Sequence, residues 1–179
     1  MSDRVAVLKD GRLVQIDTPE RLYDRPCDAF VASFIGEATM LDVTRAGDDA
    51  VRLGDTVLRT AHPLPRGEKL LLAVQTEKLV IDGENRHANA NRLSCRVTEV
   101  LYQGESLRVF AALADGTAIS LRQPGSHDAR QRIPAPGASM TVALDPQDTI
   151  VVSARFLSTP VHGWFPSSRI KCKLQRMKQ

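Results

Sequence analysis

The most constraining feature of this sequence is a run of alternating apolar residues that continues across an Asp-Gly turn. Residues 107–113 carry an apolar side chain at every second position, Asp115-Gly116 follows, and the alternation resumes at Ile119 and Leu121. A period of two places the apolar side chains on one face of a β-strand. Asp-Gly between two such runs is a strong short-range signal for a hairpin. The sequence therefore predicts an antiparallel hairpin with one buried face.

Short runs of the same kind, separated by glycine and proline, occupy most of the chain beyond Met40. Residues 69–74 form a continuous apolar run, which is typical of a strand buried on both faces. Segments 82–91 and 126–136 lack this pattern, and we expect both to be exposed loops. Further strands are expected over residues 41–43, 51–53, 57–58, 93–97, 140–144 and 149–154. This organisation predicts a mainly β fold, an antiparallel barrel or sandwich.

The first 36 residues predict a hairpin followed by two short helices. Two apolar runs, 5–8 and 13–16, flank a Lys-Asp-Gly turn at 9–11, where glycine accepts a positive φ. Thr18-Pro19 is typical of a helix start, and Pro26 ends that helix near Asp24. The second helix is expected to run from about Asp28 to Gly36. Its apolar side chains recur four residues apart on one face.

Composition excludes several classes of protein. The net charge is only +3, and five of the basic residues lie in the final segment 156–179, so the remainder is close to neutral and does not suggest a nucleic-acid-binding core. The three cysteines, Cys27, Cys95 and Cys172, are too far apart for a zinc site or a disulfide framework. No signal peptide opens the chain and no apolar run approaches the ~20 residues that span a bilayer. We therefore expect a cytoplasmic protein.

Several short motifs follow one another in fixed order near the start of the chain. They are Ser2-Asp3-Arg4, Lys9-Asp10-Gly11-Arg12, Gln15-Ile16-Asp17-Thr18-Pro19-Glu20, Tyr23-Asp24-Arg25-Pro26 and Phe30-Val31-Ala32-Ser33-Phe34-Ile35-Gly36. Together they resemble the end of the nucleotide-binding domain in ATP-binding subunits of ABC importers, in the branch that serves maltose-type sugars, polyamines and iron. Asp17 stands where that family usually has glycine. The β-rich remainder resembles the regulatory domain called TOBE, which implies an OB-like antiparallel β-barrel.

The resemblance implies two segments: residues 1–36 as the end of an ABC ATPase domain and 37–155 as the TOBE domain. Residues 156–179 resemble nothing in the family. Their composition indicates a basic, mobile tail, with binding of phospholipid or nucleic-acid phosphates as the alternative. Two departures stand in the β region. Gln75-Thr76-Glu77-Lys78 occupies a position where the family commonly has Arg-Pro-Glu, and Gln103 replaces leucine in a Tyr-Leu-Gly bend.

The machinery of ATP hydrolysis is missing from this sequence. A P-loop needs the pattern GxxxxGK[ST] to hold phosphates, and neither that pattern nor an LSGGQ-like signature occurs. None of the four histidines, His62, His87, His127 and His162, stands where the family has its switch histidine. We therefore expect this chain to be no enzyme, with no catalytic residue, no cofactor and no metal.

We considered four acidic residues, Glu77, Glu99, Glu105 and Asp115, as ligands for a polycation such as a polyamine, against the simpler interpretation of solvated charges at strand ends and turns. His62, His87 and His127 are expected in loops, and Ser94, Ser106 and Ser120 lack a base. Gly67, Gly104 and Gly125 are too isolated to cradle a phosphate, and turn geometry explains them. No ligand-binding residue is assigned.

The resemblance implies a noncatalytic regulatory and dimerisation domain of an importer subunit for solutes such as spermidine, putrescine or iron. Its expected partners are ABC membrane subunits and a second ATPase subunit at the inner face of the cell membrane. We expect a homodimer, because the opening segment carries apolar side chains made to cover an ATPase core: Val5, Val7, Leu13, Ile16, Phe30, Val31, Phe34 and Ile35. The alternatives to the dimer are a segment that folds back on its own barrel or is disordered. The alternative functions are a free-standing OB-type binder of an oligonucleotide or small anion, and a truncated gene product with no independent activity.

Overall fold

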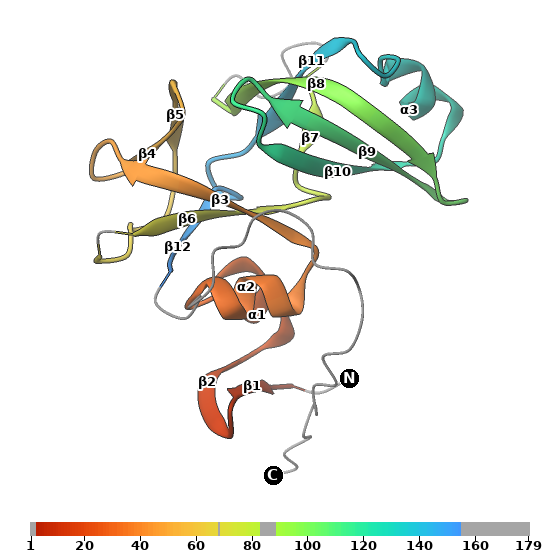
Figure 1. Cartoon of the computed structure of the whole chain (residues 1–179). Coiled ribbons are helices and arrows are strands. Elements are labelled where there is room, and N and C mark those ends of the chain that lie inside the picture. Colours follow the sequence, from red (N-terminus) through yellow and green to blue (C-terminus); the bar gives the residue numbers. More distant parts are fainter. Residues whose placement is uncertain (1–2, 68, 83–88, 155–179) are drawn as a thin grey trace.

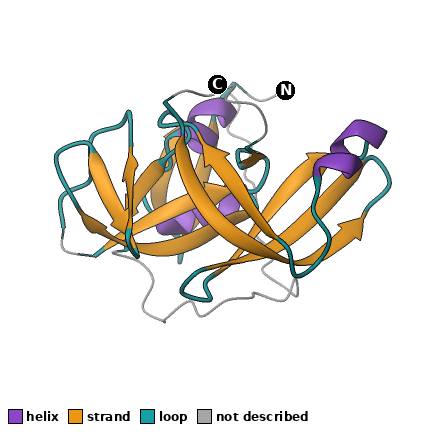
Figure 2. Cartoon of the chain, turned by 90° about the horizontal axis from the view of Figure 1, so that it is seen from above, coloured by secondary structure: helices purple, strands orange, loops and turns teal. Residues whose placement is uncertain are grey.

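The computed structural model describes residues 3–67, 69–82 and 89–154, so the basic tail expected at 156–179 lies outside the described residues. Two curled antiparallel sheets enclose one core, and a small hairpin–helix unit lies beside the second sheet (Figure 1). The view from above shows the sheets curving around the core as an incomplete barrel (Figure 2). The expected OB-like antiparallel β architecture is confirmed.

The hairpin–helix unit follows the local signals of the sequence. It comprises β1 (Val5–Lys9), β2 (Arg12–Asp17), α1 (Pro19–Asp24) and α2 (Ala29–Ile35). Asp10 and Gly11 both have positive φ, at 49° and 77°, which is the two-residue turn that matches strand twist. The side chains of Thr18 and Asp28 cap α1 and α2 by accepting from backbone N–H groups three residues on.

The first barrel sheet has the order β10-β9-β8-β11-β7. In the β9–β10 hairpin Ala111 pairs with Ile119 and Val109 with Leu121, which confirms the antiparallel hairpin predicted from the alternation and the Asp-Gly turn. β8 shifts register between Val97 and Glu99, where it bulges. The strands of this sheet are β7 (Val80–Ile81), β8 (Asn91–Tyr102), β9 (Ser106–Leu113), β10 (Ala118–Pro124) and β11 (Ser139–Leu144).

The second sheet has the order β12-β6-β3-β4-β5. Every residue of β6 is buried, as its apolar run predicted. Leu72 and its alternate neighbours face the main core, whereas Leu71 faces the other way, against Ala29 of α2. The strands of this sheet are β3 (Ala38–Arg45), β4 (Ala50–Leu53), β5 (Thr56–Arg59), β6 (Leu70–Gln75) and β12 (Ile150–Ser153).

Three expectations about local structure were wrong, whereas the expected stop of α2 at Gly36 is confirmed. Segment 126–136 is not all loop, because Ser126 caps a short exposed helix, α3 (His127–Arg132); six residues without an apolar face give no helical periodicity. His127 therefore begins a helix. Asn91 is a buried strand residue, not the end of an exposed loop. Gly36 ends α2, but with extended φ; its role is spatial, because a Cβ there would lie 3.2 Å from the Tyr23 ring.

The opening segment buries part of its apolar surface within the same chain. Val7 of β1 and Val31 of α2 are enclosed together with Leu22 of α1, and Phe30 stacks on Phe34 with ring centroids 5.8 Å apart. Leu13 remains 58% exposed. Of the eight apolar side chains named in the sequence analysis, two are buried within the chain, five are half-buried and Leu13 is exposed. The chain therefore covers part of this surface itself, and the expected homodimer stays a prediction.

Candidate functional site

A small groove lies where the hairpin–helix unit meets the barrel, and we call it the junction groove. It is a cavity of about 190 Å³ whose walls come from the end of α1, the segment after β5, the end of β6 and the β11–β12 turn. Its lining residues are Asp24, Arg25, His62, Gln75, Lys78, Gln147, Asp148 and Ile150. All but Ile150 are polar, so we tested what chemistry they can support.

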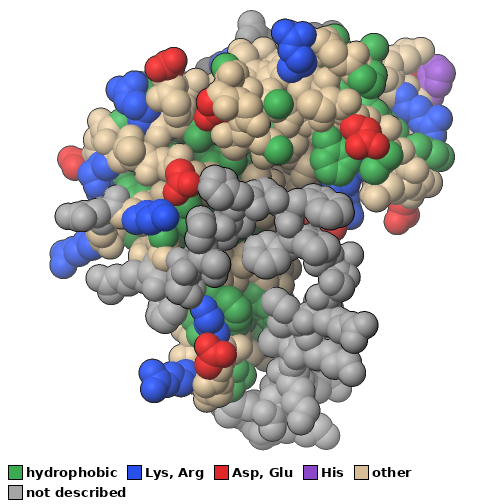
Figure 3. Space-filling model, viewed as in Figure 1, with side chains coloured by type: hydrophobic (Ala, Val, Ile, Leu, Met, Phe, Trp, Pro, Cys, Tyr) green, Lys and Arg blue, Asp and Glu red, His purple; other side chains and the backbone are tan. Residues whose placement is uncertain are grey.

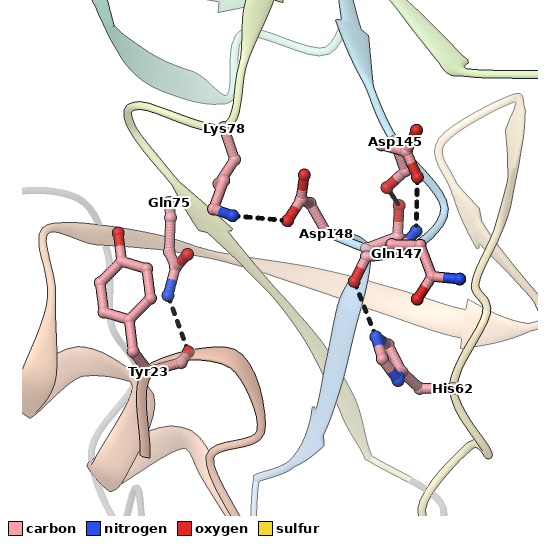
Figure 4. Close-up of polar contacts among 8 residues, drawn as sticks. Tyr23, His62, Gln75, Lys78, Asp145, Gln147 and Asp148 are labelled. Carbon is pink, nitrogen blue, oxygen red and sulfur yellow. Dashed lines mark hydrogen bonds and ion pairs between the residues drawn. The ribbon is translucent and has the colours of Figure 1, made fainter. Parts of the chain in front are cut away.

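An ion pair between Lys78 and Asp148 crosses the groove (Figure 4). The Lys78 Nζ lies 2.8 Å from Asp148 Oδ1, and both side chains are about one third exposed. This hydrogen bond to Asp148, together with the negative charges of Asp24 and Glu77, raises the pKa of Lys78 above its ordinary value against the opposing effect of burial. The ammonium is therefore firmly charged and unsuited to act as a general base.

Hydrogen bonds to backbone carbonyls fix two more of the polar side chains, Gln75 and His62. Gln75 Nε2 donates to the carbonyl oxygen of Tyr23 at 3.0 Å and so ties β6 to α1. His62 Nε2 lies 2.7 Å from the carbonyl oxygen of Gln147, which makes this nitrogen the donor. Gln75 thus performs a joining role at the position where the resemblance led us to expect arginine.

The junction groove has the properties of a joint between two units. Its volume is below the ~300 Å³ at which ligand pockets usually begin. The described residues include no group of three His, Cys, Asp or Glu side chains that could hold a metal ion. Asp148 is engaged by Lys78, and no serine or cysteine lines the cavity. The groove therefore offers a polar contact between units and no nucleophile.

The four acidic candidates do not converge on one place. Glu77 follows β6, Glu99 lies inside β8 at the bulge, and Glu105 and Asp115 lie in the turns at opposite ends of β9. The eight residues of β9 separate these two turns by about 25 Å at ~3.3 Å per residue. Asp115 accepts from the Thr117 N–H at 2.9 Å, which lowers the pKa of its carboxyl. These positions favour separate solvated charges.

The other sequence candidates are scattered or structural. Ser94, Ser106 and Ser120 lie on three different strands, and His87 lies outside the described residues. Gly104 has φ +79°, and a Cβ at Gly125 would lie 2.6 Å from the Gly104 carbonyl oxygen. Both glycines therefore serve the backbone of the β8–β9 turn and its neighbour, as turn geometry predicted.

The two cysteines in the described part of the chain are free thiols. Burial raises the pKa of the Cys95 thiol, and burial together with the nearby Asp28 carboxylate raises the pKa of Cys27. A raised pKa keeps both thiols protonated at neutral pH, and the protonated form is a poor nucleophile and metal ligand.

Sequence reasoning missed a buried polar cluster that joins the two sheets. The Asn91 side chain of β8 accepts a hydrogen bond from the Arg59 N–H and donates one to the Arg59 carbonyl, both at 2.7 Å. Its amide group therefore pairs with the backbone of β5 in the way that a residue of an adjacent strand would. Its Nδ2 also donates to Thr149 Oγ1 at 2.9 Å, and Thr60 Oγ1 donates to the Thr149 carbonyl. The only sequence signal was asparagine at a strand start, which is too common to identify a buried bridge.

The face of the molecule seen in Figure 3 is mixed in charge. In Figure 3 basic and acidic side chains alternate over the visible face, and no large area carries a single sign. None of the helices in the described part of the chain is long and apolar enough to cross a membrane.

Comparisons with known proteins agree with this architecture. Residues 72–152 match the family model of the TOBE domain. The spermidine/putrescine import ATP-binding protein PotA of Ruegeria pomeroyi is 36% identical over 150 residues, which is 80% of this chain and 39% of that protein. The sn-glycerol-3-phosphate import ATP-binding protein UgpC of Cereibacter sphaeroides is 35% identical over 133 residues, 74% of this chain and 36% of that protein. The chain spans about two fifths of the length of these curated relatives.

One solved structure supports the fold alone. The cytoplasmic molybdate-binding protein ModG, crystallised with molybdate bound, aligns with a TM-score of 0.53 over 64% of this chain and 94% of its own chain. Its sequence identity is only 18%, so the likeness concerns the arrangement of strands.

Proposed function

We propose that this chain has a regulatory function. The premise is that it contains a TOBE domain and is similar to the C-terminal part of ABC importer ATP-binding subunits. The chain acts as a noncatalytic regulatory and dimerisation module: residues 1–36 end an ATPase domain, 37–155 form the regulatory domain and 156–179 form a tail. It hydrolyses no ATP by itself, because its sequence has neither a P-loop nor a signature motif.

The observation that carries this proposal is the fixed joint between the two units. Ala29 of α2 is fully buried against Leu71, Ile150 and Val152 of the barrel, and Gln75 binds the α1 carbonyl across the junction groove. A regulatory domain can influence an ATPase only if the two move as one body or have discrete relative positions. Apolar contact plus a directional hydrogen bond provides such a coupling.

The proposed partners are a second copy of this chain, a second ATPase subunit and the membrane subunits of an ABC importer. In this complex the chain lies in the cytoplasm at the inner face of the cell membrane. We propose polyamine import as the process, because several of the relatives are named as spermidine/putrescine importers. Other relatives are named for glycerol phosphate and sulfate, and solute choice belongs to other subunits of such systems.

The proposed dimer contact is the hairpin β1–β2, where Leu13 is 58% exposed and both outer strand edges lack a neighbouring strand in the described sheet. An exposed leucine on an unpaired hairpin gains burial from a second copy related by a two-fold axis. We expect the full chain to be dimeric by light scattering at micromolar concentration.

The variant Leu13→Asp tests this contact, because a carboxylate there would be buried without a partner in the dimer. We expect it to be monomeric. Val57→Asp is the matched control, since Val57 is 47% exposed on β5 of the barrel, and it should remain dimeric. A monomeric parent chain, or equal dimerisation of both variants, would remove the assembly role.

An OB-type binder of single-stranded nucleic acid is less well supported. Successive bases stack on aromatic side chains that share a face. Phe110 and Tyr102 lie on opposite faces: Tyr102 pairs with the buried Leu107, whereas Phe110 alternates with the buried Val109 and Ala111. The barrel therefore lacks a continuous stacking surface in its described residues.

A further inference from the structure

Two arginines lie side by side on the outer face of the β9–β10 hairpin. Arg108 and Arg122 are directly paired across the strands, and their neighbours Val109 and Leu121 point into the core, so the two guanidinium groups share the opposite face. Like charges in directly opposite positions destabilise a sheet unless a counter-charge lies between them. This pair therefore needs an anion.

Glu37 supplies only part of that counter-charge. Its carboxylate lies 3.3 Å from Arg108 Nη2, 3.4 Å from Arg108 Nη1 and 3.8 Å from Arg122 Nη2. Charge-assisted hydrogen bonds are usually ~2.7–2.9 Å, so all three contacts are long. One carboxylate faces two guanidinium groups, which leaves an excess positive charge at this place.

The Nε–H of Arg108 is buried and has no hydrogen-bond partner among the residues that the structure describes. A buried donor without an acceptor costs free energy, and such groups in folded proteins call for an explanation such as an absent ion. Arginine typically binds oxyanions through Nε and one Nη together. The side of the guanidinium that is best suited to an oxyanion is thus the side that Glu37 leaves unused.

The surrounding backbone holds this arrangement in place. The buried Thr76 donates its N–H to the Glu37 carbonyl at 3.3 Å and accepts from the Arg122 N–H at 2.7 Å. The Arg108 guanidinium also lies 5.5 Å from the Phe110 ring centroid, where ring and cation attract each other. Arg122 and Glu37 are about half exposed, so a solute can reach the pair from water.

We propose that Arg108 and Arg122 form a binding site for a small tetrahedral oxyanion of the phosphate or sulfate class. The anion takes the place of the Glu37 side chain between the two guanidinium groups, and a small turn of the Arg108 side chain brings its Nε–H to an anion oxygen. Three or four oxygen atoms satisfy more donors than the two of a carboxylate. No bond is made or broken, and the site is independent of the assembly role because it lies within one chain.

Occupation of this site would also change the joint between the units. Glu37 stands between α2 and β3, and its contacts with Arg108 and Arg122 attach that connection to the first barrel sheet. An oxyanion that displaces the carboxylate releases this attachment. The oxyanion would then act on the position of the hairpin–helix unit relative to the barrel.

Calorimetric titration of the full chain with inorganic phosphate and with sulfate, at constant ionic strength set by sodium chloride, tests the site. We expect one site per chain. Arg122→Gln should weaken binding at least tenfold, or about 1.4 kcal/mol, and Arg108→Lys should do so too because it keeps the charge and loses the fork. Glu37→Gln should tighten binding at least threefold, because the competing carboxylate is gone.

The control variant is Arg96→Gln on β8, whose Arg96 Nη1 donates to the Gly137 carbonyl; it should bind like the parent chain. The Nε–H resonance of Arg108 should shift on addition of phosphate, which reports the contact even if an Arg108 variant folds poorly. Absence of binding, unchanged binding in Arg122→Gln, or weaker binding in Glu37→Gln would overturn the proposal. So would binding to vesicles containing phosphatidic acid with none to free phosphate or sulfate.

Discussion

The barrel and the hairpin–helix unit are stabilised in different ways. Among the described residues, twenty buried side chains from both sheets form the barrel core. The core of the hairpin–helix unit contains three, Val7, Leu22 and Val31. Each fully buried aliphatic side chain stabilises the folded state by roughly 1.5–3 kcal/mol, so the barrel core has ample apolar burial. The three buried side chains of the hairpin–helix unit contribute far less than the conformational entropy cost of ordering its roughly thirty residues.

This difference implies that the hairpin–helix unit depends on what it touches. Its fully buried apolar contact with the barrel is made by Ala29, which packs against β6 and β12. Its signals for turns and caps are local and strong, so the unit has a defined structure but little independent stability. The barrel is stable through its own core, whereas residues 1–36 fold only when the hairpin–helix unit packs against the barrel.

The largest expected effect is on the barrel, from Asn91→Ala. The change leaves the part-buried Arg59 N–H and carbonyl without their partners and removes the donor to the buried Thr149 hydroxyl. A polar group that loses its partner away from water costs about 1–3 kcal/mol. We expect the free energy of unfolding, measured with urea, to fall by at least about 2 kcal/mol for the whole chain. Thr98→Ala at the exposed bulge of β8 is the control and should change it by less than about 0.5 kcal/mol.

A smaller fall for Asn91→Ala would mean that water reaches Arg59 and replaces the amide. The two sheets would then be held together by apolar burial alone, and the contrast between barrel and hairpin–helix unit would rest on the size of their cores.

The contrast also explains which features could be predicted from the sequence. Thr18, Asp28 and the Asp10-Gly11 turn act through neighbours within a few residues, so their patterns were sufficient. The alternation in β9 and β10 predicted the hairpin because one face of these strands is buried. By contrast, Asn91 contacts Arg59, 32 positions away, and Thr149, 58 positions away, and no local pattern contains that information.

The junction groove and the arginine pair were unpredictable for the same reason. Lys78 and Asp148 meet only because β6 and β12 are neighbours in the sheet. β7 consists of two residues that become a strand only by pairing with β11. Glu37 stands before β3 in an unremarkable polar position, and only the folded chain brings it to Arg108, 71 positions away.

An intermediate effect is expected from Ala29→Leu, which acts on the joint. Ala29 has no exposed surface, and extra methylene groups in a packed site cost about 1–3 kcal/mol. We expect hydrogen exchange to quicken throughout residues 3–36, while amides of β8 and β9 keep their protection. Ser33→Leu places the same side chain at an exposed position of α2 and should leave both regions unchanged. Equal loss of protection in β9 would mean that the two units unfold together.

The smallest effect concerns the Lys78–Asp148 ion pair, which belongs to the barrel although it faces the joint. Both residues lie in turns that follow barrel strands, and the bond that crosses to α1 is the separate contact from Gln75 to Tyr23. Asp148→Asn should therefore lower the free energy of unfolding of the barrel, by less than about 1 kcal/mol at pH 7 because the pair is partly exposed. Protection of residues 3–36 should not change.

The pH dependence separates the ion pair from simple packing. Asp148 raises the pKa of Lys78 in the folded chain above the ordinary value of 10.5. A raised folded-state pKa means that the stabilisation is complete at pH values below 10.5 and is lost as the pH rises through the higher, folded-state value. The difference in urea unfolding free energy between the parent chain and Asp148→Asn should therefore be constant from pH 7 to 9 and shrink above pH 10.5.

Asp55→Asn, in the exposed turn between β4 and β5, should show no such trend. If the difference in unfolding free energy persists after Lys78 has lost its proton, the effect of Asp148→Asn comes from the conformation of the β11–β12 turn. The charge of the Lys78–Asp148 pair would then contribute nothing to the stability of the barrel at this joint.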